Sequence, residues 1–209
     1  MKILLSSGFN TYNRILKVYP AYQAYVGPFR TPKSGHNFEF LSRLNQPVAL
    51  DNAAFIDFSE KKFLSMVDKA RATETEIAWV AVPDCVGCAR TTDLIFDVWQ
   101  PRIDDLPLAY VAQDGSEDSV IPFSAVECVF IGGTTEWKLS KTAVDVIREA
   151  QHLKKIVHMG RVNSDKRLRY CYTLGIDSVD GTGYFRFNRN ELLKALHFMD
   201  GLHRQETFL

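Results

Sequence analysis

The segment Gly175-Ile176-Asp177-Ser178-Val179-Asp180-Gly181-Thr182-Gly183 places two acids on a short apolar run that ends in a Gly-Thr-Gly turn. A strand delivers its last side chain to a loop, and glycines there let the backbone bend sharply and a ligand approach closely. Because side chains alternate along a strand, Asp177 and Asp180 point to opposite faces. We predict Asp180 as the catalytic acid, although an Asp-Gly pair alone is more often a turn cap.

Short apolar runs recur along the rest of the chain and alternate with stretches of helical length. Predicted strands are residues 3–5, 22–26, 48–50, 77–82, 108–112, 128–131, 156–158 and 178–180. Predicted helices are residues 59–72, 91–99, 140–153, 164–174 and 189–202. This alternation indicates a parallel sheet of βαβ units, and continuous apolar strands are typical of a sheet covered on both faces.

Seven or eight strands in 209 residues suit a small (β/α)8 barrel with some crossovers shortened. An open doubly wound sheet is the alternative, and both folds bind ligands at the carboxyl ends of their strands. Nearly every predicted strand is followed by a chemically useful group: Asp51-Asn52, Asp84, Gln113, Gly132-Gly133, Arg161 and Asp180. Because a barrel brings all strand ends to one pocket, we predict an α/β fold, a TIM-like barrel formed by residues 1–209 as a single domain.

The composition is that of an ordinary soluble globular protein, with 46% hydrophobic and 24% charged residues. The 25 basic residues balance the 25 acidic ones, so a nucleic-acid partner would have to meet a local basic patch. No window approaches the roughly 18 apolar residues of a membrane span, and we expect no membrane partner. Four scattered cysteines fit a reducing cytoplasm, with Cys85 and Cys88 as structural thiols and not half of a zinc site.

Two carboxylates on separate strand ends, Asp51 and Asp180, are the minimum set for exchange at a glycosidic carbon. One attacks the anomeric carbon as a nucleophile, and the other moves a proton to and from the leaving group. In a retaining double displacement the two carboxyl groups lie roughly 5 Å apart, which leaves no room for a water between them.

A third acid, an amide and a glycine pair predict a base-reading site beside those carboxylates. Asp84 can accept from ring N–H and amino groups, and the Gln113 amide can donate to a carbonyl. Gly132 and Gly133 expose backbone N–H groups without a Cβ in the way. We add Asn52, Met159 and Arg161, their neighbours in sequence, as further substrate-binding residues.

These segments together resemble the tRNA-guanine transglycosylase superfamily, most closely its short branch of bacterial and phage 7-deazaguanine DNA transglycosylases. The resemblance covers about residues 48–187 and is made specific by the order and spacing of its parts. The matching segments are Asp51-Asn52-Ala53-Ala54-Phe55, Val82-Pro83-Asp84, Val111-Ala112-Gln113-Asp114-Gly115, Ile131-Gly132-Gly133, His158-Met159-Gly160-Arg161 and Gly175-Ile176-Asp177-Ser178-Val179-Asp180.

The resemblance implies a barrel that exchanges a guanine in a nucleic acid for a 7-deazaguanine such as preQ0, in a bacterial or phage-infected cell. It implies that Asp180 is the nucleophile and Asp51 the general acid/base, and that Asp84, Gln113 and the glycine pair bind the base. The reaction needs no metal or redox cofactor.

Departures from the family pattern narrow the expected partners. The zinc cluster of the tRNA enzymes is missing and the chain is much shorter than theirs, so we expect DNA as the acceptor, with tRNA less favoured, and a free 7-deazaguanine base as the second substrate. Gly181-Thr182-Gly183 replaces the family's Pro-Thr-Arg, and Ala53-Ala54 replaces a glycine pair and narrows the space beside the base. A homodimer remains open.

Three alternative functions remain open besides DNA-directed exchange. The first is tRNA-directed exchange, and the second is an N-glycosidase that uses the same acids with water as acceptor. The third is a catalytically silent nucleic-acid-binding paralogue. Retention of both Asp51 and Asp180 argues against that third alternative, because two carboxylates in one pocket are costly.

Basic residues and one histidine follow or end the later strands. We predict Arg161 and Arg186 as phosphate contacts, and residues 166–169 as a solvated helix face. His158, at a strand end, is predicted as a core histidine with satisfied hydrogen bonds.

Overall fold

Within the described residues, eight parallel strands form a closed barrel in which each strand pairs with its neighbour in sequence. The computed structural model describes residues 1–6, 9–34, 38, 45–186 and 189–206. The strands are β1 (Lys2–Leu5), β2 (Val26–Arg30), β3 (Val48–Leu50), β4 (Ile77–Ala81), β5 (Leu108–Ala112), β6 (Cys128–Ile131), β7 (Ile156–Met159) and β8 (Ser178–Asp180). Pairing of β8 with β1 closes the ring, which confirms the predicted (β/α)8 barrel and excludes an open sheet.

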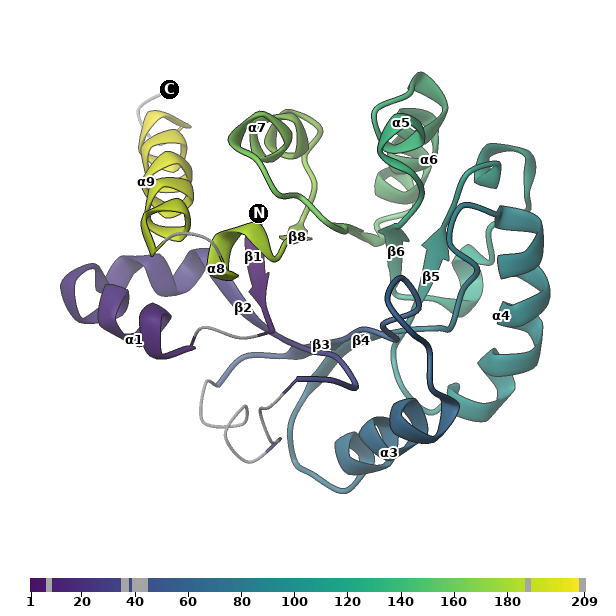
Figure 1. Ribbon diagram of the computed structural model, residues 1–209. Helices are drawn as coiled ribbons and strands as arrows, with labels where there is room; N and C mark the ends of the chain where they lie inside the picture. Colours follow the sequence, from purple (N-terminus) through teal and green to yellow (C-terminus); the bar gives the residue numbers. More distant parts are fainter. Residues whose placement is uncertain (7–8, 35–37, 39–44, 187–188, 207–209) are drawn as a thin grey trace.

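Helices surround the ring of strands on its outer side (Figure 1). The α-helices are α1 (Phe9–Val18), α3 (Glu60–Arg71), α4 (Ala89–Ile103), α5 (Thr135–Lys138), α6 (Lys141–His152), α7 (Asp165–Thr173), α8 (Gly183–Arg186) and α9 (Arg189–Glu206). The crossover from β5 to β6 contains only the short 3-10 helices η2 (Ser116–Asp118) and η3 (Phe123–Ala125). No helix in the described part of the chain is long and apolar enough to cross a membrane.

The predicted strand at residues 22–26 is wrong, because residues Pro20–Tyr25 form the 3-10 helix η1. Pro20 stands at its start, where a fixed φ and a missing N–H suit a helical turn. The strand instead begins at Val26 and runs through Gly27 and Pro28, two residues that normally indicate a turn.

The barrel interior is a packed core of alternating large and small side chains. It contains Leu4, Phe29, Ala49, Trp79, Ala81, Ala109, Val111, Cys128 and Phe130. The alanines lie on the three adjacent strands β3, β4 and β5 and leave room for the Trp79 ring, which is 2% exposed. The alternate side chains of each strand pack outward against the helices.

Serine side chains cap the first turns of α6 and α7. The Ser140 hydroxyl accepts from the Ala143 amide at 3.2 Å, and the Ser164 hydroxyl accepts from the Arg167 amide at 3.4 Å. Gly175 follows α7 with φ of 71°, a conformation that favours glycine. Helix α6 precedes β7 and helix α7 connects β7 to β8, so these caps fix the ends of the helices next to the two strands that carry one half of the site.

Candidate functional site

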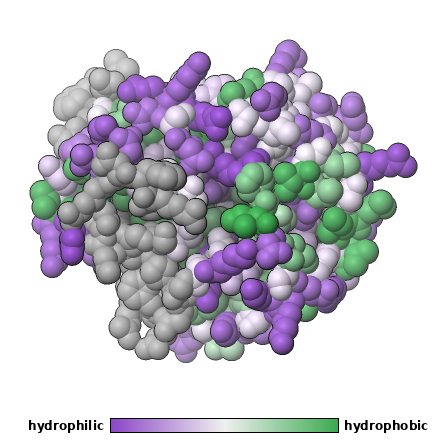
Figure 2. Space-filling view, viewed as in Figure 1, coloured by the Kyte–Doolittle hydropathy of each residue, from purple (hydrophilic) through white to green (hydrophobic). Residues whose placement is uncertain are grey.

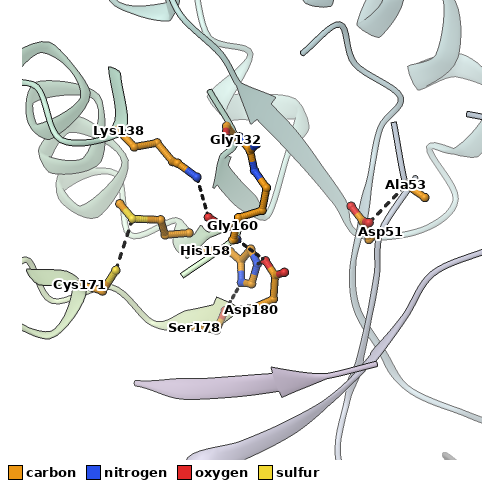
Figure 3. Close-up of polar contacts among 11 residues, drawn as sticks. Asp51, Ala53, Gly132, Lys138, His158, Gly160, Cys171, Ser178 and Asp180 are labelled. Atoms are coloured by element: carbon orange, nitrogen blue, oxygen red, sulfur yellow. Dashed lines mark hydrogen bonds and ion pairs between the residues drawn. The ribbon is translucent and has the colours of Figure 1, made fainter. Parts of the chain in front are cut away.

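The carboxyl ends of the strands bring three acids to one end of the barrel. Asp51 directly follows β3, Asp84 is the third residue after β4, and Asp180 ends β8. Figure 3 shows Asp51 and Asp180 on opposite sides of this opening, with their carboxylates directed toward each other. The charges of Asp180 and Asp84 both act on Asp51, so the three acids share one electrostatic environment.

One carboxylate oxygen of Asp180, Oδ1, is fixed in position by two hydrogen bonds. His158 Nε2 lies 3.1 Å from Asp180 Oδ1, and the Arg161 amide donates to the same oxygen at 3.2 Å. The side chain of Asp180 is 19% exposed, and within the described residues its Oδ2 accepts no hydrogen bond. Because both hydrogen bonds end on Oδ1, Oδ2 remains available to act as a nucleophile.

His158 is fully buried in the middle of the barrel and lies between Ser178 and Asp180 (Figure 3). Its Nδ1 lies 2.9 Å from the Ser178 hydroxyl, and its ring contacts Phe130 and Trp79 with centroid separations of 4.5 and 5.0 Å. The prediction of a satisfied core histidine is confirmed. Its contact with the candidate nucleophile was not predicted from the sequence.

A signal for this contact is present in the strand pattern. Ser178 and Asp180 are two residues apart on β8 and therefore share a face, and His158 pairs with Ser178 across the ladder. His158, Ser178 and Asp180 thus all point inward from two neighbouring apolar strands, a pattern that predicts a polar cluster inside the barrel.

Asp51 has the most strongly perturbed carboxyl group of the site. Burial, followed by repulsion from Asp180 and Asp84, raises its pKa to about 7. The Ala53 amide donates to Oδ2 at 3.2 Å, and this hydrogen bond opposes the rise in pKa. Ala53 takes a left-handed conformation with φ of 61° to make this contact. A carboxyl group with such a pKa carries a proton near neutral pH and can give it to a leaving group.

Asp84 is held by two buried amides, one on each carboxylate oxygen. Asn52 Nδ2 donates to Oδ1 at 2.7 Å, and Gln113 Nε2 donates to Oδ2 at 2.7 Å. Burial raises the pKa of Asp84 to about 6, and the two amides and the charge of Arg161 oppose that rise. Each oxygen keeps a further lone pair, so Asp84 can still accept from a ligand.

Asn52 and Gln113 therefore occupy a different role from the predicted one. Their side chains are 2% and 1% exposed, and their remaining polar atoms bond within the protein. Asn52 Nδ2 also donates to the Val82 carbonyl at 2.8 Å, and Gln113 Oε1 accepts from the Gly87 amide at 2.8 Å. These residues position Asp84 in this structure, and their contact with a base stays a prediction.

Gly132 and Gly133 do not present free N–H groups as predicted, because both amides donate to the Ala112 carbonyl. Their carbonyls accept from Arg161 Nη2, at 2.9 Å for Gly132. A Cβ at Gly132 would lie 2.6 Å from Gln113 Nε2, and one at Gly133 would lie 2.3 Å from the Trp137 ring. Close packing accounts for both glycines.

Arg161 lies at the opening, as predicted. Its φ of 60° turns its amide toward Asp180, and its guanidinium stacks over the Phe55 ring at 4.0 Å. Met159 is the exception among the predicted site residues on this segment. It follows inward-facing His158, so strand alternation turns it outward, where Cys171 Sγ lies 3.3 Å from its sulfur.

Other predicted residues lie around the same end. Cys85 and Cys88 are free thiols in the loop between β4 and α4. Lys166 is exposed on α7, as predicted. Arg167, predicted to be solvated, is instead half-buried and turned toward Thr135, 3.4 Å from its hydroxyl. The side chain of Arg186 lies outside the described part of the chain.

The surface around the opening is mixed in character. In the space-filling view, hydrophobic side chains gather near the middle of this face and toward α4, among hydrophilic ones (Figure 2). Phe55 and Ile56, in the loop after β3, are 59% and 70% exposed. An apolar, aromatic surface is therefore available beside Asp51.

No protein-family model and no curated protein matches this chain. Among solved structures it is similar to a putative glycerophosphoryl diester phosphodiesterase from Silicibacter pomeroyi DSS-3, with 17% identity and a TM-score of 0.44 over 76% of this chain and 52% of that one. It is also similar to an HpcH/HpaI aldolase from Desulfitobacterium hafniense DCB-2, with 10% identity and a TM-score of 0.46 over 86% and 85%. The chain spans about half the length of the first. Likeness at this level says nothing about activity.

Proposed function

We propose that this protein is a retaining base-exchange transglycosylase that replaces guanine in a polynucleotide, DNA before tRNA, with a free 7-deazaguanine. The observation that carries the proposal is the pair of opposed carboxylates, Asp51 and Asp180, at the open end of one barrel. They differ in environment, as an acid and a nucleophile in one reaction must.

In the first half of the reaction, Asp180 Oδ2 forms a bond to C1′ of the nucleotide while the bond from C1′ to the guanine nitrogen breaks. Asp51 gives its proton to the departing guanine, since its raised pKa of about 7 leaves a large share of Asp51 protonated near neutral pH. His158 and the Arg161 amide hold Asp180 in place during the attack. The product is a covalent ester between Asp180 and the sugar.

In the second half, Asp51 accepts a proton from the incoming base, whose nitrogen attacks C1′ and displaces the Asp180 carboxylate. Two inversions at C1′ leave its configuration unchanged. Asp84, with its spare lone pairs, accepts from the N–H edge of whichever base is present. The exposed Phe55 ring beside Arg161 offers a stacking surface for a base.

Incubation with a labelled 7-deazaguanine and separate DNA and tRNA pools tests the proposal. Label incorporated into DNA supports it as stated, and label found only in tRNA corrects the acceptor. Release of guanine without incorporation would identify a hydrolase and contradict exchange. Absence of both release and incorporation from either pool would also contradict it.

A further inference from the structure

A small pocket with three basic residues in its lining, called here the basic pocket, lies beside Asp180, between the segments that follow β6 and β7. It is lined by Thr135, Lys138, Leu139, Met159, Gly160, Arg161, Val162 and Arg167. Three of these side chains are cations and none is an acid. Lys138 comes from the short helix α5, Arg161 from the loop after β7, and Arg167 from α7.

Lys138 is the most unusual member, because a lysine is rarely buried without an acidic partner. It is only 4% exposed, and its Nζ donates to the Gly160 carbonyl at 2.7 Å. An ammonium group has three N–H donors, so two remain for another acceptor. Burial, with repulsion from Arg161 and Arg167, lowers the pKa of Lys138 to about 8.

Neither Arg161 nor Arg167 donates a hydrogen bond to a carboxylate within the described residues. Within the described residues Arg161 donates to the carbonyls of Gly132 and Gly133, and Arg167 to the Arg161 carbonyl at 3.5 Å and the Thr135 hydroxyl at 3.4 Å. Three cations thus surround one pocket with only neutral acceptors bound to them. The carboxylates that act on Lys138 and Arg161, chiefly that of Asp180, do so at a distance and without a hydrogen bond to them, so a further anion could still bind here.

We propose that this basic pocket binds a phosphate group of the polynucleotide whose base is exchanged. Guanidinium groups match the geometry of phosphate oxygens, and an ammonium adds a point charge and further donors. Loops at this end of TIM barrels frequently hold phosphate groups. The inference rests on the proposed function, because that function brings a sugar-phosphate chain to Asp180.

Two consecutive residues, Gly160 and Arg161, connect the basic pocket to Asp180. The Gly160 carbonyl accepts from Lys138, and the next residue, Arg161, donates its amide to Asp180. A Cβ on Gly160 would lie 3.4 Å from Asp180 Oδ1. A nucleotide whose C1′ meets Asp180 therefore has its adjoining phosphate within reach of the pocket.

Arg167→Gln tests this inference, with Lys166→Gln as a matched control. Both replace one cation on the same helix, but Lys166 is exposed and does not line the pocket. Lys138→Met is less suitable, because a buried substitution can prevent folding. Affinity for a guanine-containing DNA oligonucleotide is measured by fluorescence anisotropy over a range of salt concentrations, after circular dichroism has shown that both variants fold.

We expect Arg167→Gln to bind the oligonucleotide about tenfold more weakly than wild type, the usual loss for a hydrogen bond to a charged group. Its affinity should also change roughly threefold less over a fourfold rise in salt, since one phosphate contact is missing. Lys166→Gln should keep the wild-type affinity and salt dependence. Equal losses in both variants, or none in Arg167→Gln, would overturn the inference.

Two further measurements separate the possible outcomes. Inorganic phosphate that binds the wild-type protein without competing with the oligonucleotide would assign the pocket to a free phosphate and overturn the polynucleotide assignment. If the wild type exchanges no base but Arg167→Gln still loses affinity as expected, the phosphate pocket stands and the proposed exchange fails. If the wild type exchanges bases and Arg167→Gln binds normally, only the pocket assignment fails.

Discussion

The two sides of the barrel opening hold their acids in opposite ways. On the side of β3, β4 and β5, Asp84 is bound by the neutral amides of Asn52 and Gln113, and repulsion between acids adds to burial at Asp51. On the side of β7 and β8, Asp180 is bound by His158 and a backbone amide. The comparison teaches that neighbours, and not residue type, divide the roles: on one side burial and nearby acids raise the pKa of Asp51, and on the other two hydrogen bonds to Oδ1 fix the position of Asp180.

The largest expected effect comes from removing the charge on the β8 side. Asp180→Asn should lower base exchange on the order of 10⁴-fold or more and abolish the covalent adduct with the polynucleotide, because an amide cannot replace the carboxylate nucleophile. Adduct formation is followed by denaturing electrophoresis. Asp177→Asn is the matched control, since Asp177 lies on the opposite face and binds the Val157 amide at 2.8 Å. An undiminished adduct in Asp180→Asn would assign the nucleophile elsewhere.

Replacing the proton donor Asp51, on the β3 side, should lower the rate by a smaller factor. Asp51→Asn should lower the rate of adduct formation about 10²- to 10⁴-fold, the usual contribution of a general acid. The wild-type rate of adduct formation should fall as pH rises through about 7, where Asp51 loses its proton. This fall in rate with pH should be absent from Asp51→Asn. Single-turnover rates between pH 5 and 9 provide the measurement. A fall in rate that persists in Asp51→Asn would show that another group donates the proton.

The amide support of Asp84 should have a moderate effect on stability. Gln113→Leu leaves Asp84 Oδ2 and the Gly87 amide without their partners, which should lower the free energy of unfolding by about 1–3 kcal/mol. Urea unfolding measures this loss. Gln100→Leu on α4 is the control, because Gln100 makes no side-chain hydrogen bond within the described residues, and it should change stability little. Equal stability of Gln113→Leu and wild type would contradict the supporting role.

The last expected effect, one on stability and not on catalysis, is a gain for Asp51→Asn as the pH rises above about 4. An unfolded chain ionises Asp51 near pH 3.9, but the folded protein does so near 7, so ionisation between these values lowers the stability of the wild type as pH rises. Asp51→Asn carries no such charge. It should therefore equal the wild type near pH 4 and exceed it by up to about 4 kcal/mol at pH 8, as measured by urea unfolding. Asp97→Asn, on the exposed face of α4, should show no such difference; a difference of the same size there would contradict an origin in Asp51.

The same comparison shows what the sequence could predict. Alternation of apolar runs with helical stretches, together with polar residues after Leu50 and at the end of β8, predicted both the barrel and the meeting of Asp51 with Asp180. Such periodicity depends on local chain geometry, so one sequence suffices to detect it. Residues 22–26 misled because an apolar run of that length fits a short helix as well as a strand.

The details of the site depended on packing that no local pattern encodes. Asn52 and Gln113 are the residue types that bind a base, and only the structure shows that both are turned onto Asp84. Lys138 gave no signal in the sequence, because its burial depends on its contact with Gly160, a residue far along the chain in the segment after β7. Arg167 resembled its solvated neighbour Lys166, and only the structure shows that it is turned toward Thr135 at the start of α5.

Within the described residues, the buried Trp79 ring packs among Ala49, Ala81 and Ala109 and fills the middle of the barrel interior. In the proposed exchange, the outgoing and the incoming base would therefore both pass through the end of the barrel that carries Asp51 and Asp180. In the proposed exchange guanine must leave before its replacement enters, so the enzyme would obey ping-pong kinetics and excess guanine would compete with the deazaguanine for the covalent intermediate.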